Sequence, residues 1–402
     1  MTRTLIVSDL HLGGLSGIDL LRRPELRPAL LDELGGVDRL VLLGDVLELR
    51  HGPPHDALLA SRPFFEDVGR ALGPDRELII TAGNHDHLMV STWLDTRALH
   101  EPEPDPLGPE QRFEPAEASP MLAQIARWAA PTHVTVAYPG LWVRPDVYAT
   151  HGHFLDAHLT VPTLERIGVG VMGRLLERPP ATLDSAEGYE SVTAPIYAWR
   201  DAITRYAAAG PVLNGLATAR AWRALSSSGR NGAGGSGGGG ARQMLRSART
   251  AASRTAIKRG FPLMVGGLNR AGLGPVNPDI SRTALRRSGL HAMGEVAARL
   301  DLGDAYVVFG HTHRAGPFPE DPASEWRGRG GARLVNSGSW VYDGIFLTAT
   351  PGESPYWPGT CVLVEDTGPP VHKRLLLDRS HSELSTPSYE PSHAKPGVKH
   401  VA

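Results

Sequence analysis

Five short polar clusters along the chain combine residue types that bind metal ions and activate water. They are Asp9-Leu10-His11, Gly44-Asp45, Gly83-Asn84-His85-Asp86, His151-Gly152-His153 and Gly310-His311-Thr312-His313. Carboxylate, imidazole and amide groups are ligands that suit Mn, Fe, Zn or Ni. Any one cluster alone is typical of a turn or a surface loop, but the five together favour a metal site. A cation would offset the cost of gathering Asp and His side chains away from water.

Two of the clusters have a spacing that bears on geometry. Side chains two residues apart on an extended segment point to the same side of the chain. The spacing therefore predicts that Asp9 and His11 face one site together, and that His311 and His313 do the same. The only cysteine is Cys361, which excludes an internal disulfide and a multi-cysteine zinc site.

Each cluster follows a short apolar run that is typical of a strand buried on both faces. These runs cover residues 5–7, 40–43, 78–80, 147–149 and 306–309, and two more at 332–335 and 361–364 close the series. Segments 24–34 and 57–72, between the first three runs, have a helical pattern. This alternation predicts an α/β fold with an at least partly parallel sheet. In such sheets, ligands bind at the loops that leave the carboxyl ends of the strands.

In their order and spacing, the clusters resemble the signature of the calcineurin-like metallophosphoesterase superfamily, which runs D-x-H, G-D, G-N-H-D/E, H and G-H-x-H. The resemblance covers residues 4 to about 100, 147–156 and 305–345. It implies a four-layer αββα sandwich with the residues between 155 and 300 as a long, mostly helical insertion.

The resemblance also implies two divalent metal ions that share one carboxylate. The first ion would be held by Asp9, His11, Asp45 and His313, and the second by Asp45, Asn84, His151 and His311. Manganese is the first expectation, with Fe, Zn or Ni as alternatives. His85 would act on the leaving oxygen, and Asp86 would orient His85. Two such ions can share a hydroxide and clamp the phosphoryl oxygens.

The implied reaction is hydrolysis of a phosphodiester, pyrophosphate or phosphomonoester bond. Within the superfamily, the strings Ser8-Asp9-Leu10-His11-Leu12 and Gly44-Asp45-Val46-Leu47-Glu48 are similar to those of the bacterial UDP-2,3-diacylglucosamine hydrolase-like group. They depart from the G-D-x-V-D-R-G and G-N-H-E strings of the Ser/Thr protein phosphatases. The chain differs from the first group in having His151-Gly152-His153 where H-G-D is usual, and in its longer insertion. The resemblance thus implies a lipid-linked or nucleotide substrate.

Three further residues are candidates for substrate contact. Arg50 and Arg314 flank the second and fifth clusters and could pair with a phosphate group, with a salt bridge as the alternative. His153 lies two residues beyond a predicted ligand and could touch substrate, with a plain loop role as the alternative.

The pattern predicts four parts of the chain. Residues 1–154 form the first part of the core, with an acidic Pro-rich loop at 101–120 that has little regular structure. Residues 155–300 form a basic helical insertion or cap with a Gly/Ser-rich loop at 226–240. Residues 301–378 complete the core, and 379–402 are expected to be a disordered tail.

Charge along the insertion bears on partners. The formal net charge of the chain is −2, which predicts no global attraction to nucleic acid or membrane. From Ala202 to Pro278 there is no Asp or Glu, while Arg and Lys are frequent. Such a segment suits an anionic lipid surface or a lipid-phosphate substrate, and equally a nucleic-acid backbone. A helical cap with solvated charges is the third interpretation.

Two other functions compete with the phosphoesterase. One is a metal-dependent nuclease, which the acid-free basic segment suggests, and the other is a non-catalytic scaffold that uses the same fold. The chain shows no signal-peptide pattern and no apolar stretch of the roughly 18 residues that a membrane span needs. We therefore expect a cytoplasmic protein, with peripheral contact at the inner membrane surface as an option.

Overall fold

The structure is a computed structural model. It describes residues 2–100, residues 104–207 apart from 162, 178, 180 and 181, isolated positions between 266 and 279, and residues 281–387. The Gly/Ser-rich run at 226–240 and nearly all of the acid-free basic segment lie outside the described residues.

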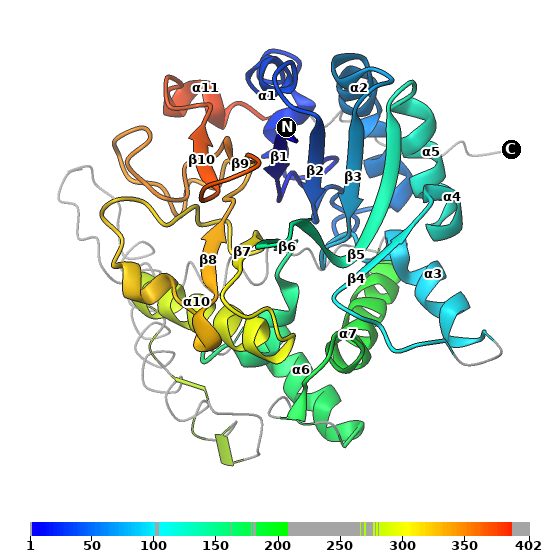
Figure 1. Cartoon of the computed structure of the whole chain (residues 1–402), viewed down its shortest axis with the longest axis vertical. Helices are drawn as coiled ribbons and strands as arrows, with labels where there is room; N and C mark the ends of the chain where they lie inside the picture. The colour runs from blue at the N-terminus through cyan, green and yellow to red at the C-terminus, as the bar shows by residue number, and fades with distance from the viewer. Residues whose placement is uncertain are drawn as a thin grey trace, which may run out of the picture.

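One large mixed sheet of ten strands runs through the molecule (Figure 1). The strands are β1 (Thr4–Val7), β2 (Arg39–Leu43), β3 (Glu77–Thr81), β4 (Glu110–Phe113), β5 (His133–Arg144), β6 (Val147–Thr150), β7 (Tyr306–Phe309), β8 (Arg333–Asn336), β9 (Thr360–Val364) and β10 (Val371–Arg374). Their order is β10-β9-β1-β2-β3-β5-β6-β7-β8, and β4 pairs with β5. Strands β1, β2, β3 and β5 are parallel, as are β6, β7 and β8, whereas β5 and β6 are antiparallel. The predicted α/β fold with a partly parallel sheet is confirmed.

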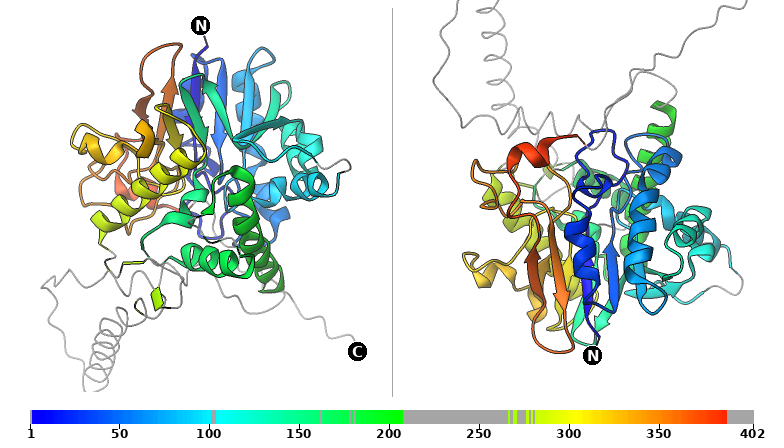
Figure 2. Two further views of the ribbon diagram at one scale, coloured as in Figure 1. Left: turned by 60° about the horizontal axis from the view of Figure 1, so that its bottom comes forward. Right: turned by 90° about the horizontal axis from the view of Figure 1, so that it is seen from above.

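Helices pack against this sheet and against one another. They are α1 (Pro28–Leu34), α2 (Pro54–Leu72), α3 (Leu88–Ala98), α4 (Pro115–Ala118), α5 (Pro120–Trp128), α6 (Leu164–Leu175), α7 (Ala186–Ala207), α10 (Arg282–Arg299) and α11 (His381–Ser385), with 3-10 turns η1 (Leu20–Arg22), η2 (His153–His158), η5 (Ala323–Trp326) and η6 (Arg329–Gly331). The predicted helical segments correspond to α1 and α2. Figures 1 and 2 show α6, α7 and α10 gathered on one side of the molecule. Among the described helices, none is both long and apolar enough to cross a bilayer.

The strands bury side chains on both faces, as their continuous apolar runs predict. In β2, Leu40 and Leu42 belong to one hydrophobic core that also contains helix side chains. Val41 and Leu43, on the opposite face, belong to a second core whose buried members all come from strands. Because successive side chains alternate between faces, strands such as β1, β2, β7 and β9 contribute to both cores. The central strands are thus buried on both faces, and the loops that follow them are anchored to rigid strand ends.

Helix α10 belongs to the larger core although it lies in the predicted insertion. Its side chains Leu290, Met293 and Val296 are buried in the same cluster as Phe309 of β7. At least this part of the segment 155–300 is therefore packed as core. The division of the chain at 154 and 300 stays a prediction.

Two expectations of irregular structure are wrong in part. The segment 101–120 contains β4, which pairs with the longer strand β5, and the short helix α4. The tail beyond 379 begins with α11, where the Ser380 side chain accepts from the backbone N–H of Glu383 and Glu383 accepts from that of Ser380. This reciprocal capping satisfies backbone donors at the helix start, which explains why a short helix forms there.

Candidate metal centre

The predicted ligands lie where strands end. Asp9 comes two residues after β1, Asp45 two residues after β2, and His151 directly after β6. Backbone hydrogen bonds fasten these loops to each other, from Asp9 N–H to Gly44 O (3.1 Å) and from His11 N–H to Asp45 O (2.9 Å). Neighbouring parallel strands bring their carboxyl ends to one edge of the sheet, so residues far apart in sequence meet there.

The first group of donor atoms comes from three of the clusters. His313 Nε2 lies 3.2 Å from Asp9 Oδ1 and 3.2 Å from His11 Nε2. His11 Nε2 is 3.7 Å from Asp45 Oδ2. Asp9, His11 and His313 together place one donor atom each close enough to hold a single ion.

The second group shares Asp45 with the first. His151 Nε2 lies 3.3 Å from Asp45 Oδ2. Asn84 Oδ1 lies 3.2 Å from both His151 Nε2 and His311 Nδ1. Asp45, His151 and His311 form a second set with the spacing that one ion requires. The structure therefore brings all seven sequence-predicted ligands into two adjoining groups that meet at Asp45.

Five of these residues have a left-handed backbone, which non-glycine residues rarely adopt. The φ angles are 56° at Asp9, 46° at His11, 50° at Asp45, 65° at His311 and 59° at His313. The prediction that Asp9 and His11 share a site is upheld, but not through the extended segment on which it was based. Each such residue costs on the order of 1–3 kcal/mol, and strain of this kind clusters at functional sites.

Two motif glycines leave the space that the donor groups occupy. A Cβ on Gly83 would lie 2.3 Å from Asp45 Oδ1, and one on Gly310 would lie 2.3 Å from Asp9 Oδ2. Atoms cannot approach this closely, so any side chain at either position would displace a carboxylate. These glycines are needed for the close approach of backbone and donor.

The donor groups attract positive charge. Burial opposes the charged form of His11, but its hydrogen bond to Glu48 and the nearby Asp45 carboxylate outweigh this and raise its pKa to about 9. Burial likewise opposes charging of His151, but Asp45 lies against the ring and the pKa rises to about 9. Asp9 Oδ1 is buried and accepts no hydrogen bond from the described residues. A bound cation fits all three observations.

The amide of Asn84 provides a further test of this fit. Its carbonyl oxygen can only accept, yet it faces the ring nitrogens of His151 and His311. Reversing the amide would direct its nitrogen toward these rings and let its oxygen accept from Arg50 Nη1 at 3.0 Å. The orientation with the oxygen inward gathers electron pairs from three side chains, which suits a cation among them.

His85 lies beside the donor groups with its side chain partly open to the cavity. Its partner is Glu48, with carboxylate oxygens 2.9 and 3.0 Å from His85 Nδ1. The prediction that Asp86 orients His85 is not what the structure shows. The Asp86 carboxylate accepts from the backbone N–H groups of Gly83 (2.7 Å) and Val46 (2.7 Å). Asp86 therefore joins the loops after β2 and β3 through backbone hydrogen bonds, whereas Glu48 contacts the His85 ring.

Sequence reasoning missed Glu48, although it had a signal. Glu48 lies three residues after Asp45 in the same loop, is 3% exposed, and also lies 3.0 Å from His11 Nδ1. Burial opposes its charged form, but His85 and the other adjacent imidazoles outweigh this and hold its pKa well below the usual range. Burial in turn lowers the pKa of His85 to about 4. A carboxylate in the loop of a predicted ligand was the available clue.

The three candidate substrate residues have different surroundings. The Arg314 guanidinium pairs with Asp321 and lies over the Trp326 ring, so the salt bridge considered as its alternative is present. Arg50 is buried with its guanidinium 5.2 Å from the centre of the Tyr197 ring. His153 is buried with its ring 5.6 Å from that of His151. Substrate contact by these residues stays a prediction.

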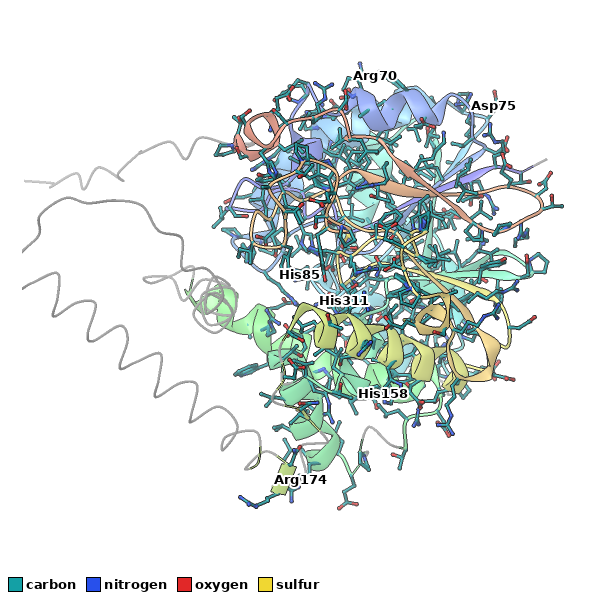
Figure 3. The ribbon with its side chains drawn as sticks, turned by 90° about the vertical axis from the view of Figure 1, so that its left-hand side faces the viewer. Arg70, Asp75, His85, His158, Arg174 and His311 are labelled. Atoms are coloured by element: carbon teal, nitrogen blue, oxygen red, sulfur yellow. The ribbon has the colours of Figure 1, made fainter. Side chains whose placement is uncertain are left out.

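A cavity of about 390 Å³ opens onto the donor groups. His11, Asp45, Asn84, His85, His311 and His313 line one side of it. Apolar residues line much of the remainder, including Leu155, Leu159, Val161, Leu285, Leu290 and Phe346. Figure 3 shows His85 and His311 where the sheet meets the helices of the segment 155–300. The site is therefore accessible to a ligand with both a polar and an apolar part.

Comparison with known proteins gives no family for this chain. No protein-family model matches it. No curated protein matches it at a significant level.

Proposed function

We propose that this protein is a metal-dependent phosphoesterase of the calcineurin-like type. The observation that carries the proposal is the pair of adjoining donor groups that share Asp45. Asp9, His11, Asp45 and His313 would hold one divalent ion, and Asp45, Asn84, His151 and His311 the other. The second core, built from strand side chains alone, supports the four-layer αββα arrangement that the resemblance implies.

Bound divalent ions would polarise the phosphoryl oxygens and lower the pKa of a water molecule. The residues of the chain supply the rest. His85 lines the cavity beside the donor groups, where its imidazolium, protonated on both ring nitrogens, would donate a hydrogen bond from Nε2 to the leaving oxygen as charge develops there. Glu48 holds the Nδ1 side of His85, so that Nε2 is the atom directed away from its partner. The neutral Asn84 oxygen limits the negative charge that an anionic substrate meets.

The substrate that we propose is a phosphodiester or pyrophosphate with an apolar group beside the phosphate. The apolar part of the cavity wall supports this, because it would bury such a group next to the reacting centre. A lipid-linked or nucleotide compound of the kind cleaved by the bacterial UDP-2,3-diacylglucosamine hydrolase-like group fits the description. Peripheral contact with an anionic membrane would place the protein near such a substrate.

The test is hydrolysis of bis(p-nitrophenyl) phosphate by chain stripped of metal and reloaded with Mn²⁺. We expect turnover that depends on Mn²⁺ and is lost in Asp45→Ala. Asp146→Ala, which removes an exposed carboxylate paired with Arg144, is the matched control and should keep full activity. Absence of turnover with Mn²⁺, Fe²⁺, Zn²⁺ and Ni²⁺, or full activity of Asp45→Ala, would overturn the proposal.

A further inference from the structure

A buried carboxylate outside the predicted motifs touches one of the proposed ligands. Asp156 Oδ1 lies 3.0 Å from His311 Nε2, and Asp156 is 2% exposed. The other ring nitrogen, Nδ1, faces the Asn84 oxygen in the second donor group. His311 is therefore contacted on both sides, with the carboxylate at its outer nitrogen.

We propose that Asp156 is a positioning residue that holds His311 for the second metal site, an inference that rests on the metal centre proposed above. With Asp156 accepting a hydrogen bond from Nε2–H, the lone pair of Nδ1 points to the donor group of Asp45 and His151. A carboxylate at the outer nitrogen fixes the tautomer and the ring orientation and makes the imidazole a stronger ligand.

A similar arrangement occurs at two of the other three proposed histidine ligands. His151 Nδ1 lies 3.0 Å from the backbone oxygen of Leu43, and His11 Nδ1 lies 3.0 Å from Glu48. Both of these rings thus have an oxygen acceptor at the nitrogen that faces away from the donor group. Asp156 fills for His311 the place that Leu43 and Glu48 fill for these two rings.

The burial of Asp156 also needs a cationic partner. Its Oδ2 is buried and accepts no hydrogen bond from the described residues. An ionised carboxylate away from water is costly unless charge compensates it. The described group in hydrogen-bond contact with it is the His311 ring, whose positive character would rise on binding a cation.

Asp156 comes from η2, the first turn of the predicted insertion, and this turn is held on both flanks. The rings of Phe154 and Tyr189 of α7 stack with centres 5.0 Å apart, and His158 Nε2 lies 2.6 Å from the Tyr189 hydroxyl. The backbone N–H of Thr160 donates to Ser288 of α10 at 2.8 Å. These contacts with α7 and α10 therefore fix the position of Asp156 beside the proposed metal centre.

The experiment titrates metal-free full-length chain with Mn²⁺ and follows free Mn²⁺ by electron paramagnetic resonance. We expect two equivalents in the wild type. Asp156→Ala should weaken one equivalent by roughly 10–100-fold and leave the other unchanged. Asp156→Asn should weaken the same equivalent less, because its amide oxygen still accepts from Nε2–H but carries no charge. Asp146→Ala, the exposed control, should bind as the wild type does.

A melting curve in EDTA separates positioning from a merely structural role. If Asp156 positions His311, the metal-free melting temperature of Asp156→Asn should stay close to that of the wild type, because the amide oxygen still accepts from Nε2–H and no buried donor is left unpaired. The inference is overturned if the second equivalent keeps wild-type affinity, or if both equivalents weaken along with the metal-free melting temperature. Should Asp156→Ala not fold, Asp156→Asn decides by the same criteria. A wild-type chain that binds no Mn²⁺ overturns the proposed function itself, and this inference with it.

Discussion

At the scale of single residues, Glu48 links two parts of the site. Its carboxylate contacts both His85, which we propose acts on the leaving oxygen, and His11, a proposed ligand. Glu48→Gln keeps the shape but removes the charge that holds both imidazoles. We expect kcat to fall by roughly 10²-fold with Mn²⁺ saturating. The loss should be larger for a diester with an alkyl leaving group than for a p-nitrophenyl ester, because nitrophenolate departs without a proton. Equal losses for both esters would contradict the role of His85.

For Asp86 we expect a substitution to lower stability rather than to lower kcat selectively. Its carboxylate accepts backbone hydrogen bonds from Gly83, Val46 and Leu47. Asp86→Asn replaces one acceptor oxygen by a donor, and bonds to a charged group contribute about 1.5–3 kcal/mol each. We therefore predict a lower melting temperature in EDTA, measured by circular dichroism. An unchanged melting temperature with a selective loss of kcat would restore the assignment of Asp86 as the partner of His85.

Gly83 tests the packing of the donor groups. In Gly83→Ala the new methyl group would meet Asp45 Oδ1 at 2.3 Å. We expect at least one Mn²⁺ equivalent to be lost, measured by metal analysis after gel filtration. Gly35→Ala is the matched control, since its Cβ would come no closer than 3.7 Å to Asp32 O. Two retained equivalents in Gly83→Ala would show that the groups are not packed as described.

The sequence was sufficient to bring together the predicted ligands, because each lies in a short motif after a strand. It was insufficient for Asp156, whose partner His311 lies elsewhere in the chain, whereas Glu48 lies in the loop of Asp45 and was overlooked. Asp156 is five residues beyond His151 but contacts His311, so only the packing of η2 against α10 and beside the loop after β7 reveals it. The left-handed backbone of Asp9 and His11 was likewise not predicted, since Asp and His adopt positive φ more often than most non-glycine residues but still rarely.

At the scale of elements, β9 contains the only cysteine. Cys361 is fully buried between β1 and β10, and burial raises its pKa to about 12. At pH 8 we expect no reaction with Ellman's reagent in the native chain and one thiol per chain in urea. Ser382→Cys places a thiol at an exposed site on α11 and should react at once. Rapid labelling of the native wild type would contradict the placement of β9.

The same shift has a consequence for stability. The folded-state pKa of Cys361 lies above its ordinary value of 9.0, so the folded chain disfavours the thiolate. The stability that the folded chain gains by holding Cys361 as a thiol is fully present below pH 9, and it is lost as the pH rises above that value toward the folded-state pKa.

Elements with continuous apolar runs were predictable, whereas the polar edge strands β4 and β10 were not. Strands β4 and β10 read Glu-Gln-Arg-Phe and Val-His-Lys-Arg, because each lies at an edge and pairs with one neighbour. Strand β5 was missed because Pro139 and Gly140 interrupt its pattern. Helix α11 had a signal in Ser380 and Glu383, three residues apart, which is the spacing of a capping box.

At the scale of the whole molecule, metal binding should stabilise the fold, because the donor groups exist as a set only in the folded chain. Mn²⁺ at a hundred times its dissociation constant would add about 2.7 kcal/mol for one site. We predict a rise in melting temperature on adding Mn²⁺ to metal-free chain, reversed by EDTA. Asp45→Ala should show a much smaller rise, and an equal rise in both would place the metal elsewhere.

The claim that the two donor groups form one dinuclear centre can be tested by crystallising the chain with MnCl₂ and recording anomalous scattering at the manganese edge. We expect two anomalous peaks at the strand ends, one beside Asp9, His11 and His313 and the other beside Asn84, His151 and His311, with Asp45 between them. A single peak, no peak, or peaks that do not contact Asp45 would contradict it.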